Sequence, residues 1–284
     1  MGRLDFATVE SWGGGRKKDL EDLKVLGHTH YVDGDMTLYE RLARHLEMLH
    51  KKGALSVVSA QGMHPIPHFS QWAFLGVHYC QYLENLLCVH QALEEALDNG
   101  NLALQGWLGS NQTSSLHSFR DKLSTLVPSA QLSRRPHIEH DLHRLMHGFA
   151  ISAGSADLDA SPNAKGYAHF LQTLGNRCHK AESEKEMRSL LIRLIANWYG
   201  IWLAHLTSSK QIFKVARSRL KLDQFDALHT FEKYPNEVEN PIETFKGVVS
   251  GLDDILAYED EKELFAEAPS ALRRASLLLE ALAR

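Results

Sequence analysis

The sequence predicts an all-α protein, with one compact helical domain of about eight helices. Apolar residues recur every three or four positions through most of residues 37–284, which is the spacing of one buried helix face. No short stretch alternates convincingly between apolar and polar side chains, as a half-buried strand would. Only 19 glycines and 8 prolines interrupt the 284 residues. Residues 1–36 are rich in turn formers and weakly patterned, so we expect a loosely structured arm there.

The first helix is expected to begin at Thr37, which can cap the helix together with Glu40 three residues later. Leucines then recur at helical spacing, namely Leu38, Leu42, Leu46 and Leu49. Gly53 is expected to end this helix, because glycine readily adopts the left-handed conformation that follows many helices.

A long second helix is predicted after the turn at Pro65–Pro67, and Asn99–Gly100 is expected to close it. Two further helices are predicted over residues 115–126 and 129–149. Residues 152–163, with their serines, alanines, aspartates and glycine, then form the clearest loop of the chain.

The second half of the chain continues the helical pattern. Apolar positions over residues 167–174 predict one helix, and residues 183–220 predict the longest one. Pro241 suits the first turn of the next helix, where its missing N–H is no loss. A charged helix over residues 260–283 is expected to end the domain.

The composition excludes several kinds of partner and location. A formal charge of −4 without a long basic block makes nucleic acid an unexpected partner. The longest apolar stretch, Leu190–Leu206, contains Arg193 and is too short and too polar to cross a bilayer, so we expect a soluble protein without a membrane anchor. The cysteines, Cys80, Cys88 and Cys178, lack disulfide or zinc spacing. A reducing compartment follows: the cytoplasm, or an organelle lumen after processing.

Histidine is unusually frequent, with 17 residues in the chain. The densest cluster consists of His137, His140, His143 and His147. Spacings of three and four place these side chains on one helical face, close enough to share a metal. The charged residues between them favour an ordinary solvated face instead.

Glu47 and His50 form an E-x-x-H pair, which supplies two iron ligands in carboxylate-bridged helical bundles. The partner candidate for such a site is Asp226–His229, in a loop-like region. Alternatively, His50 alone can be an axial ligand of haem iron. Haem requires small or flexible residues on a nearby helix, and Ala204–Ser209 offers them, with polar side chains that can bend a helix.

Several segments resemble the haem oxygenases and follow one another in that family's order. They are LARHLEMLH (Leu42–His50), QYLENLL (Gln81–Leu87), Pro128–Leu145, Gly166–Gly175, Asn197–Leu220 and Phe231–Ile255. The resemblance extends over residues 37–282 and implies that residues 37–284 form a haem oxygenase-like helical domain. It also implies an oxidoreductase that cleaves haem to biliverdin, carbon monoxide and ferrous iron.

The resemblance assigns haem-binding roles to particular positions. His50 stands where the family's histidine is the axial ligand of haem iron. Ser208 and Ser209 replace two glycines that let the distal helix bend over haem, and each serine adds a side chain where the backbone approaches the porphyrin. Lys246 matches a basic residue that holds a haem propionate, whereas the arginine expected one turn later is Ser250.

His205 and Tyr199 are the catalytic residues that the resemblance implies. A water held through His205, with Tyr199 nearby, would deliver a proton to the oxygen bound at iron. Electrons would come from an external donor, a reductase or a ferredoxin, because the sequence contains no flavin or nicotinamide motif. Two alternatives stay open: a non-catalytic haem-binding or scaffold protein, and a di-iron oxidase that uses Glu47 and His50.

Overall fold

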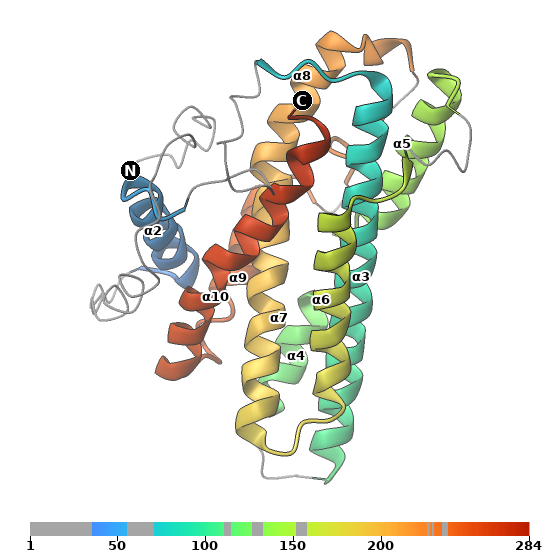
Figure 1. Ribbon diagram of the computed structural model, residues 1–284. Helices are drawn as coiled ribbons and strands as arrows, with labels where there is room; N and C mark the ends of the chain where they lie inside the picture. The colour runs from blue at the N-terminus through green and yellow to red at the C-terminus, as the bar shows by residue number, and fades with distance from the viewer. Residues whose placement is uncertain are drawn as a thin grey trace.

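Helices make up all the regular structure in the described part of the chain, which confirms the all-α prediction (Figure 1). The computed structural model describes residues 36–55, 71–110, 115–126, 133–151, 158–225, 228, 230–234 and 238–283. The predicted arm over residues 1–36 lies outside these ranges except for Met36, and so does the predicted turn at Pro65–Pro67.

The helices follow one another with short connections. They are α2 (Leu38–Lys51), α3 (Gly76–Ser110), α4 (His117–Leu126), α5 (Arg135–Gly148), α6 (Pro162–Cys178), α7 (Glu184–Ala204), α8 (Lys210–Arg219), α9 (Pro241–Ser250) and α10 (Tyr258–Leu277), with the 3₁₀ turns η6 (Leu222–Gln224) and η7 (Leu278–Ala281). The π-helical segment η5 (His205–Ser209) joins α7 directly to α8, so these two helices form one rod. Counted in this way, the described residues hold eight α-helical rods in one compact domain, as predicted.

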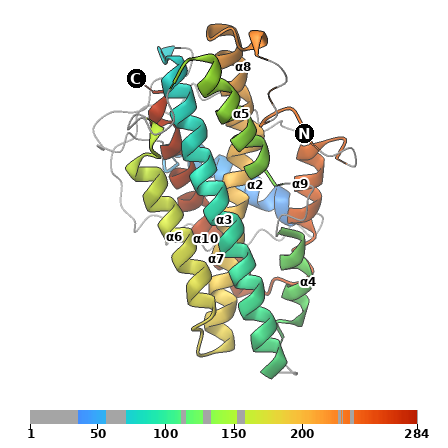
Figure 2. The same cartoon turned by 90° about the vertical axis from the view of Figure 1, so that its right-hand side faces the viewer.

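Two pairs of long helices form the centre of the bundle, α3 beside α6 and α7 beside α10 (Figure 1, Figure 2). Glycines allow the close approach within each pair. A Cβ on Gly175 of α6 would lie 2.8 Å from the backbone of Ala96 in α3. A Cβ on Gly200 of α7 would lie 2.8 Å from the Cβ of Ala271 in α10. Larger residues at these two glycines would force the helices apart.

The helix α3 is longer than the sequence predicts, because it continues through Asn99–Gly100 to Ser110. The expected end at Asn99–Gly100 was therefore wrong. Gly100 instead faces α7, where a Cβ would lie 2.9 Å from the side chain of Leu194. The glycine accommodates a neighbouring helix, at a cost of about 1 kcal/mol relative to alanine in a helix interior.

The helix α2 begins as predicted, with a capping box. The N–H of Thr37 donates to the Glu40 carboxylate at 2.9 Å, and the N–H of Glu40 donates to Thr37 Oγ1 at 3.4 Å. The predicted leucine face of α2 is buried. The guanidinium of Arg41 pairs with Asp253 at 2.6 Å and with Glu261 at 2.9 Å. These ion pairs hold the first turns of α2 beside the start of α10.

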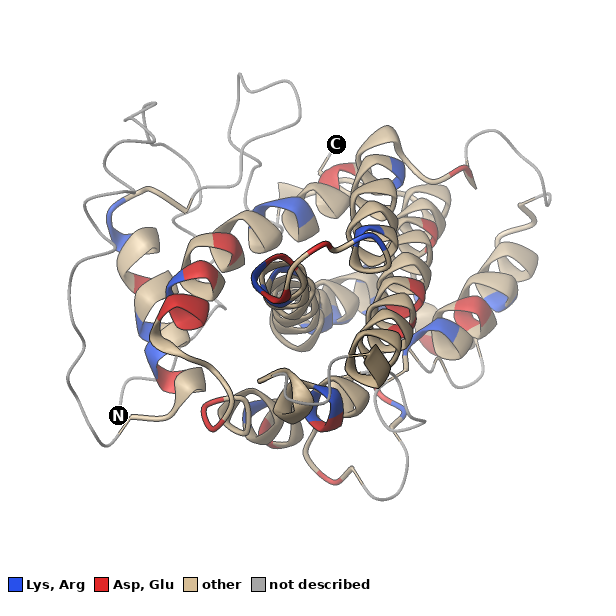
Figure 3. Ribbon diagram, turned by 90° about the horizontal axis from the view of Figure 1, so that it is seen from below, with Lys and Arg blue, Asp and Glu red and all other residues tan. Residues whose placement is uncertain are grey.

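Acidic and basic side chains are interspersed along the described helices (Figure 3). Many of them form ion pairs, such as Arg217 with Asp223 and Glu232 near the end of α8. Of the helices that the structure describes, none combines the length and the apolar character that a bilayer crossing requires.

Candidate functional site at the π turn

The α7–α8 rod changes its helical geometry at His205–Ser209, which forms a π turn. A π turn holds more residues per turn than an α-helix, and such turns occur frequently at functional sites. The hydroxyl of Thr207 donates to the Leu203 carbonyl at 2.6 Å, a side-chain bond that competes with the regular helix ladder. The distortion predicted for the small polar residues of this segment therefore takes the form of a π turn.

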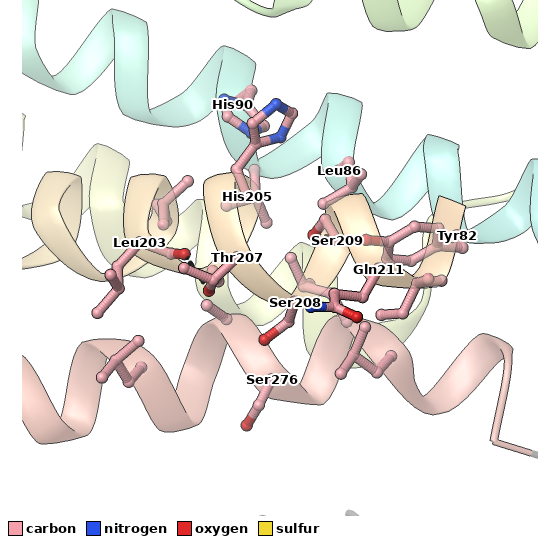
Figure 4. Close-up of a pocket in the computed structure, with 18 of the residues that line it drawn as sticks. Tyr82, Leu86, His90, Leu203, His205, Thr207, Ser208, Ser209, Gln211 and Ser276 are labelled. Atoms are coloured by element: carbon pink, nitrogen blue, oxygen red, sulfur yellow. Dashed lines mark hydrogen bonds between the residues drawn. The ribbon is translucent and has the colours of Figure 1, made fainter. Parts of the chain in front are cut away.

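A cavity lies against this turn, between α3, the α7–η5–α8 rod and the end of α10 (Figure 4). Its volume is about 60 Å³, which gives room for a few water molecules at about 10–15 Å³ each. Most of the wall is apolar. The polar members are Tyr82, His90, His205, Thr207, Ser208, Ser209, Gln211 and Ser276. An apolar wall with a few polar groups is typical of sites that bind small molecules.

Two buried histidines meet at this cavity. His90 of α3 and His205 of η5 are both 2% exposed, and their ring centroids lie 5.6 Å apart with the planes at 81°. Neither Nε2 of His90 nor either ring nitrogen of His205 has a hydrogen-bond partner among the described residues. Buried polar groups in folded proteins are nearly always bonded, so this pair needs an explanation.

Both imidazoles are held in the neutral form. Burial, followed by the positive charge of Arg134, lowers the pKa of His90 to about 3. Burial also lowers the pKa of His205 well below its usual range, with His90 and Arg134 as the next causes; the Thr230 backbone has a smaller, opposite effect. Each ring therefore offers one N–H donor and one acceptor nitrogen near neutral pH.

Arg134 holds the segment that covers His205. The guanidinium of Arg134 is fully buried and donates to the carbonyls of Lys233 at 2.8 Å and Thr230 at 3.5 Å. Between these two residues, the ring of Phe231 stacks on His205 with the centroids 5.1 Å apart. The buried cation thus fixes the cover of the imidazole and at the same time disfavours its protonation.

The hydroxyl groups of the cavity wall already have partners. The hydroxyl of Tyr82 donates to Ser209 Oγ at 2.8 Å, and that of Ser276 donates to the Arg273 carbonyl at 2.7 Å. Thr207 donates to its own helix, as described above. Among the described wall residues, the imidazole nitrogens are thus the fully buried polar atoms without a partner.

The predicted site residues divide into two groups. Those that line the cavity are His205, Ser208 and Ser209. Tyr199 and Lys246 lie elsewhere, where α7 meets α9. The ring of Tyr199 stacks on Phe245 at 5.6 Å, and its buried hydroxyl has no partner among the described residues. The ammonium of Lys246 lies 5.7 Å from the ring centroid of Tyr39 and pairs with Glu243 at 2.7 Å.

His50 lies in the last turn of α2, half-buried, and does not belong to the cavity wall. The helix α2 runs along α10: the ring of His45 lies 5.1 Å from that of Phe265, and Arg273 donates to the Ala54 carbonyl. Because α10 also packs against α7, the His50 end of α2 and the π turn both lie toward the C-terminal end of α10.

The residues considered for a non-haem metal are not gathered into a ligand set. The carboxylate of Glu47 pairs with Lys51 at 2.6 Å. The two ligand positions of Asp226–His229 lie outside the described residues. On α5, His143 and His147 are exposed, as a solvated face predicts. Within the ranges that the structure describes, no three histidine, cysteine or acidic residues are placed to hold a metal ion.

Comparisons with known proteins assign no family. No protein-family model matches the chain, and no curated protein matches it significantly. The resemblance to haem oxygenases stays a prediction from the quoted segments, and a functional conclusion depends on the chemistry of the site.

The sequence did not single out His90 or Arg134. A weak signal for His90 was present, because it interrupts the apolar face that Leu86 and Leu93 continue on α3. No local pattern distinguishes Arg134 from Arg135, although the first is fully buried and the second is exposed. Both residues gain their importance from contacts with segments far away in the chain.

Proposed function

We propose that this chain is a haem oxygenase, which binds haem and cleaves it to biliverdin, carbon monoxide and ferrous iron. One observation carries the proposal: the π turn at His205–Ser209, with its cavity and its buried neutral imidazole, falls within Asn197–Leu220. That segment is the one that resembles the distal helix of the family. Small side chains at a widened turn let a flat ligand approach the backbone closely.

The residues outside the cavity suit the polar groups of haem. The unpartnered hydroxyl of Tyr199 and the ammonium of Lys246, both adjacent to Phe245, can bind carboxylates. His50 supplies one imidazole from α2 as the axial iron ligand. The cavity of about 60 Å³ is much smaller than a porphyrin, so haem would lie outside it.

Bound haem would supply the iron at which oxygen reacts and the ring that is opened. The part of His205 is to hold a water and move a proton, since its neutral ring can accept one hydrogen bond and donate another. Trp202 and Phe231 pack against His205 and keep bulk solvent from it. The electrons would come from an external donor, a reductase or a ferredoxin, because no flavin or nicotinamide motif is present in the sequence.

A haem titration of the purified chain tests the proposal. We expect a Soret band for the wild type, and biliverdin once a reductant and oxygen are supplied. His50→Ala is expected to lose the band. His45→Ala, on the same helix and also partly buried, is the matched control and should keep it.

The remaining outcomes separate the alternatives. A Soret band without biliverdin would favour a non-catalytic haem-binding protein. Iron without haem, lost in Glu47→Ala, would favour a di-iron oxidase. A chain that binds neither haem nor iron contradicts the proposed function.

A further inference from the structure

The pair of imidazoles at the cavity requires a bridging group. His90 and His205 come from different helices and their rings are in contact, yet their unpartnered nitrogens form no hydrogen bond with each other (Figure 4). Two neutral imidazoles together present two donors and two acceptors. A group that both donates and accepts can therefore satisfy both rings at once.

The cavity has the space for such a group and no competing partners. A volume of about 60 Å³ exceeds what one water molecule needs. The hydroxyls of Tyr82, Thr207 and Ser276 each donate to a protein acceptor, so they compete little for the bridging molecule. Its orientation therefore depends on the two imidazoles.

A metal ion is a poor candidate for the bridge. The positive charge of Arg134 acts on both rings and opposes any further cation there. Trp202 and Phe231, the other rings beside His205, supply no ligand atom of the kind that metals prefer. A neutral molecule of the size of water meets neither objection.

We propose that His90 is the positioning residue of His205: water held between the two rings fixes which nitrogen of His205 carries the proton. The consequence for catalysis rests on the proposed function, whereas the water-bridged pair itself does not. An imidazole with a fixed tautomer keeps its donor and its acceptor in fixed directions, which is what a proton-transfer group requires. His90 thus acts on the reaction through His205 and not on the substrate.

The pair is tested first without haem, by long-range ¹H–¹⁵N correlation spectra of histidine-labelled full-length protein, with the His205 signals assigned by their loss in His205→Phe. We expect one fixed tautomer in the wild type and an averaged mixture in His90→Phe, which keeps the ring volume but removes both nitrogens. His169→Phe, the same change at an exposed position of α6, should leave the signals of His205 unchanged. A wild-type His205 that already averages, or a tautomer that persists in His90→Phe, overturns the proposal.

Two further measurements apply if His90→Phe fails to fold. Magnetisation transfer from water to the imidazole N–H of His205 is expected in the wild type, and its absence overturns the proposal. His90→Gln, which retains a donor and an acceptor, should keep the fixed tautomer.

The catalytic consequence is measured by single-turnover biliverdin formation. We expect a rate about tenfold lower in His90→Phe, recovery in His90→Gln, and unchanged haem affinity in both. An unchanged rate in His90→Phe would contradict a positioning role. If the wild type forms no biliverdin, the proposed function fails, while the tautomer measurement still decides the imidazole pair.

Discussion

The α7–η5 rod carries unpartnered buried polar groups on two sides, and the surroundings of the two sides differ. Toward α3, His205 lies beside His90 and a cavity, with the charge of Arg134 nearby. Toward α9, Tyr199 stacks on Phe245 and its hydroxyl has no partner among the described residues. The described cavity does not extend to this second side.

The difference indicates how each side becomes complete. A buried polar group without a partner costs about 1–3 kcal/mol, so it persists where something outside the protein chain binds it. On the α3 side the cavity has room for water, and the folded protein alone can satisfy its imidazoles. On the α9 side, the hydroxyl of Tyr199 requires an acceptor such as a ligand carboxylate. The following predictions test this distinction.

Acid is expected to have the largest effect, through the α3 side. The folded-state pKa of His90 is about 3 and that of His205 is also far below 6.5, so the unfolded state binds protons that the folded state does not. This stability is fully present above about pH 6.5 and falls toward pH 4 by up to about 1.4 kcal/mol per pH unit for each histidine. Urea unfolding between pH 7 and pH 4 measures the slope.

The matched variant for the acid effect is His90→Phe. It removes one of the two proton-binding differences, so its stability should fall less steeply with acid, by up to about 1.4 kcal/mol per pH unit. His169→Phe should keep the wild-type slope. Parallel curves for wild type and His90→Phe would show that His90 is not held neutral by the fold.

The helical class and the helix starts were predictable from the sequence because short-range patterns determine them. Thr37 and Glu40 lie three residues apart, and their capping box forms as expected. Gly100 shows the limit of such patterns: locally it resembles a helix end, but its contact with Leu194 of α7 makes it a packing residue.

The site was predictable only in part. The small polar residues after Ala204 indicated a distorted helix, and His205 lies at the start of that distortion. Its neighbour His90 was not predictable, because the pairing depends on how α3 packs against α7. The cover over His205 depends likewise on Arg134, whose burial no local pattern indicates.

Arg134→Met is expected to have the next largest effect, because it leaves the carbonyls of Lys233 and Thr230 without their donor. We expect a loss of about 2–4 kcal/mol in unfolding free energy at pH 7. The control is Arg135→Met, since Arg135 is exposed and pairs with Glu139 at the surface at 2.9 Å. That change should cost less than about 1 kcal/mol. Equal losses in the two variants would mean that the buried arginine does not stabilise the cover of the cavity.

Ser209→Gly and Ser208→Gly separate packing from ligand approach. Ser209 is buried and accepts from Tyr82, so its change to glycine should cost about 2 kcal/mol of stability. Ser208 is only partly buried at the cavity wall, and its change should cost about 1 kcal/mol. If haem approaches this turn, Ser208→Gly should tighten haem binding in a Soret titration. Unchanged affinity would show that Ser208 does not contact haem.

The smallest expected effect compares two buried tyrosines, Tyr82→Phe and Tyr199→Phe. The hydroxyl of Tyr82 donates to Ser209 at 2.8 Å, so its removal should cost about 1 kcal/mol in urea unfolding. The hydroxyl of Tyr199 has no partner among the described residues, and its removal should change stability by less than about 0.5 kcal/mol.

Haem should reverse the order of the two tyrosines. Tyr199→Phe removes a donor that a haem carboxylate can use, so its affinity for haem should fall by about fivefold to tenfold. Tyr82→Phe leaves that group intact and should bind haem as the wild type does. If Tyr199→Phe instead destabilises the haem-free protein as much as Tyr82→Phe, its hydroxyl already has a partner within the chain. The α9 side would then be complete without a ligand, and the contrast between the two sides of α7 would not concern haem.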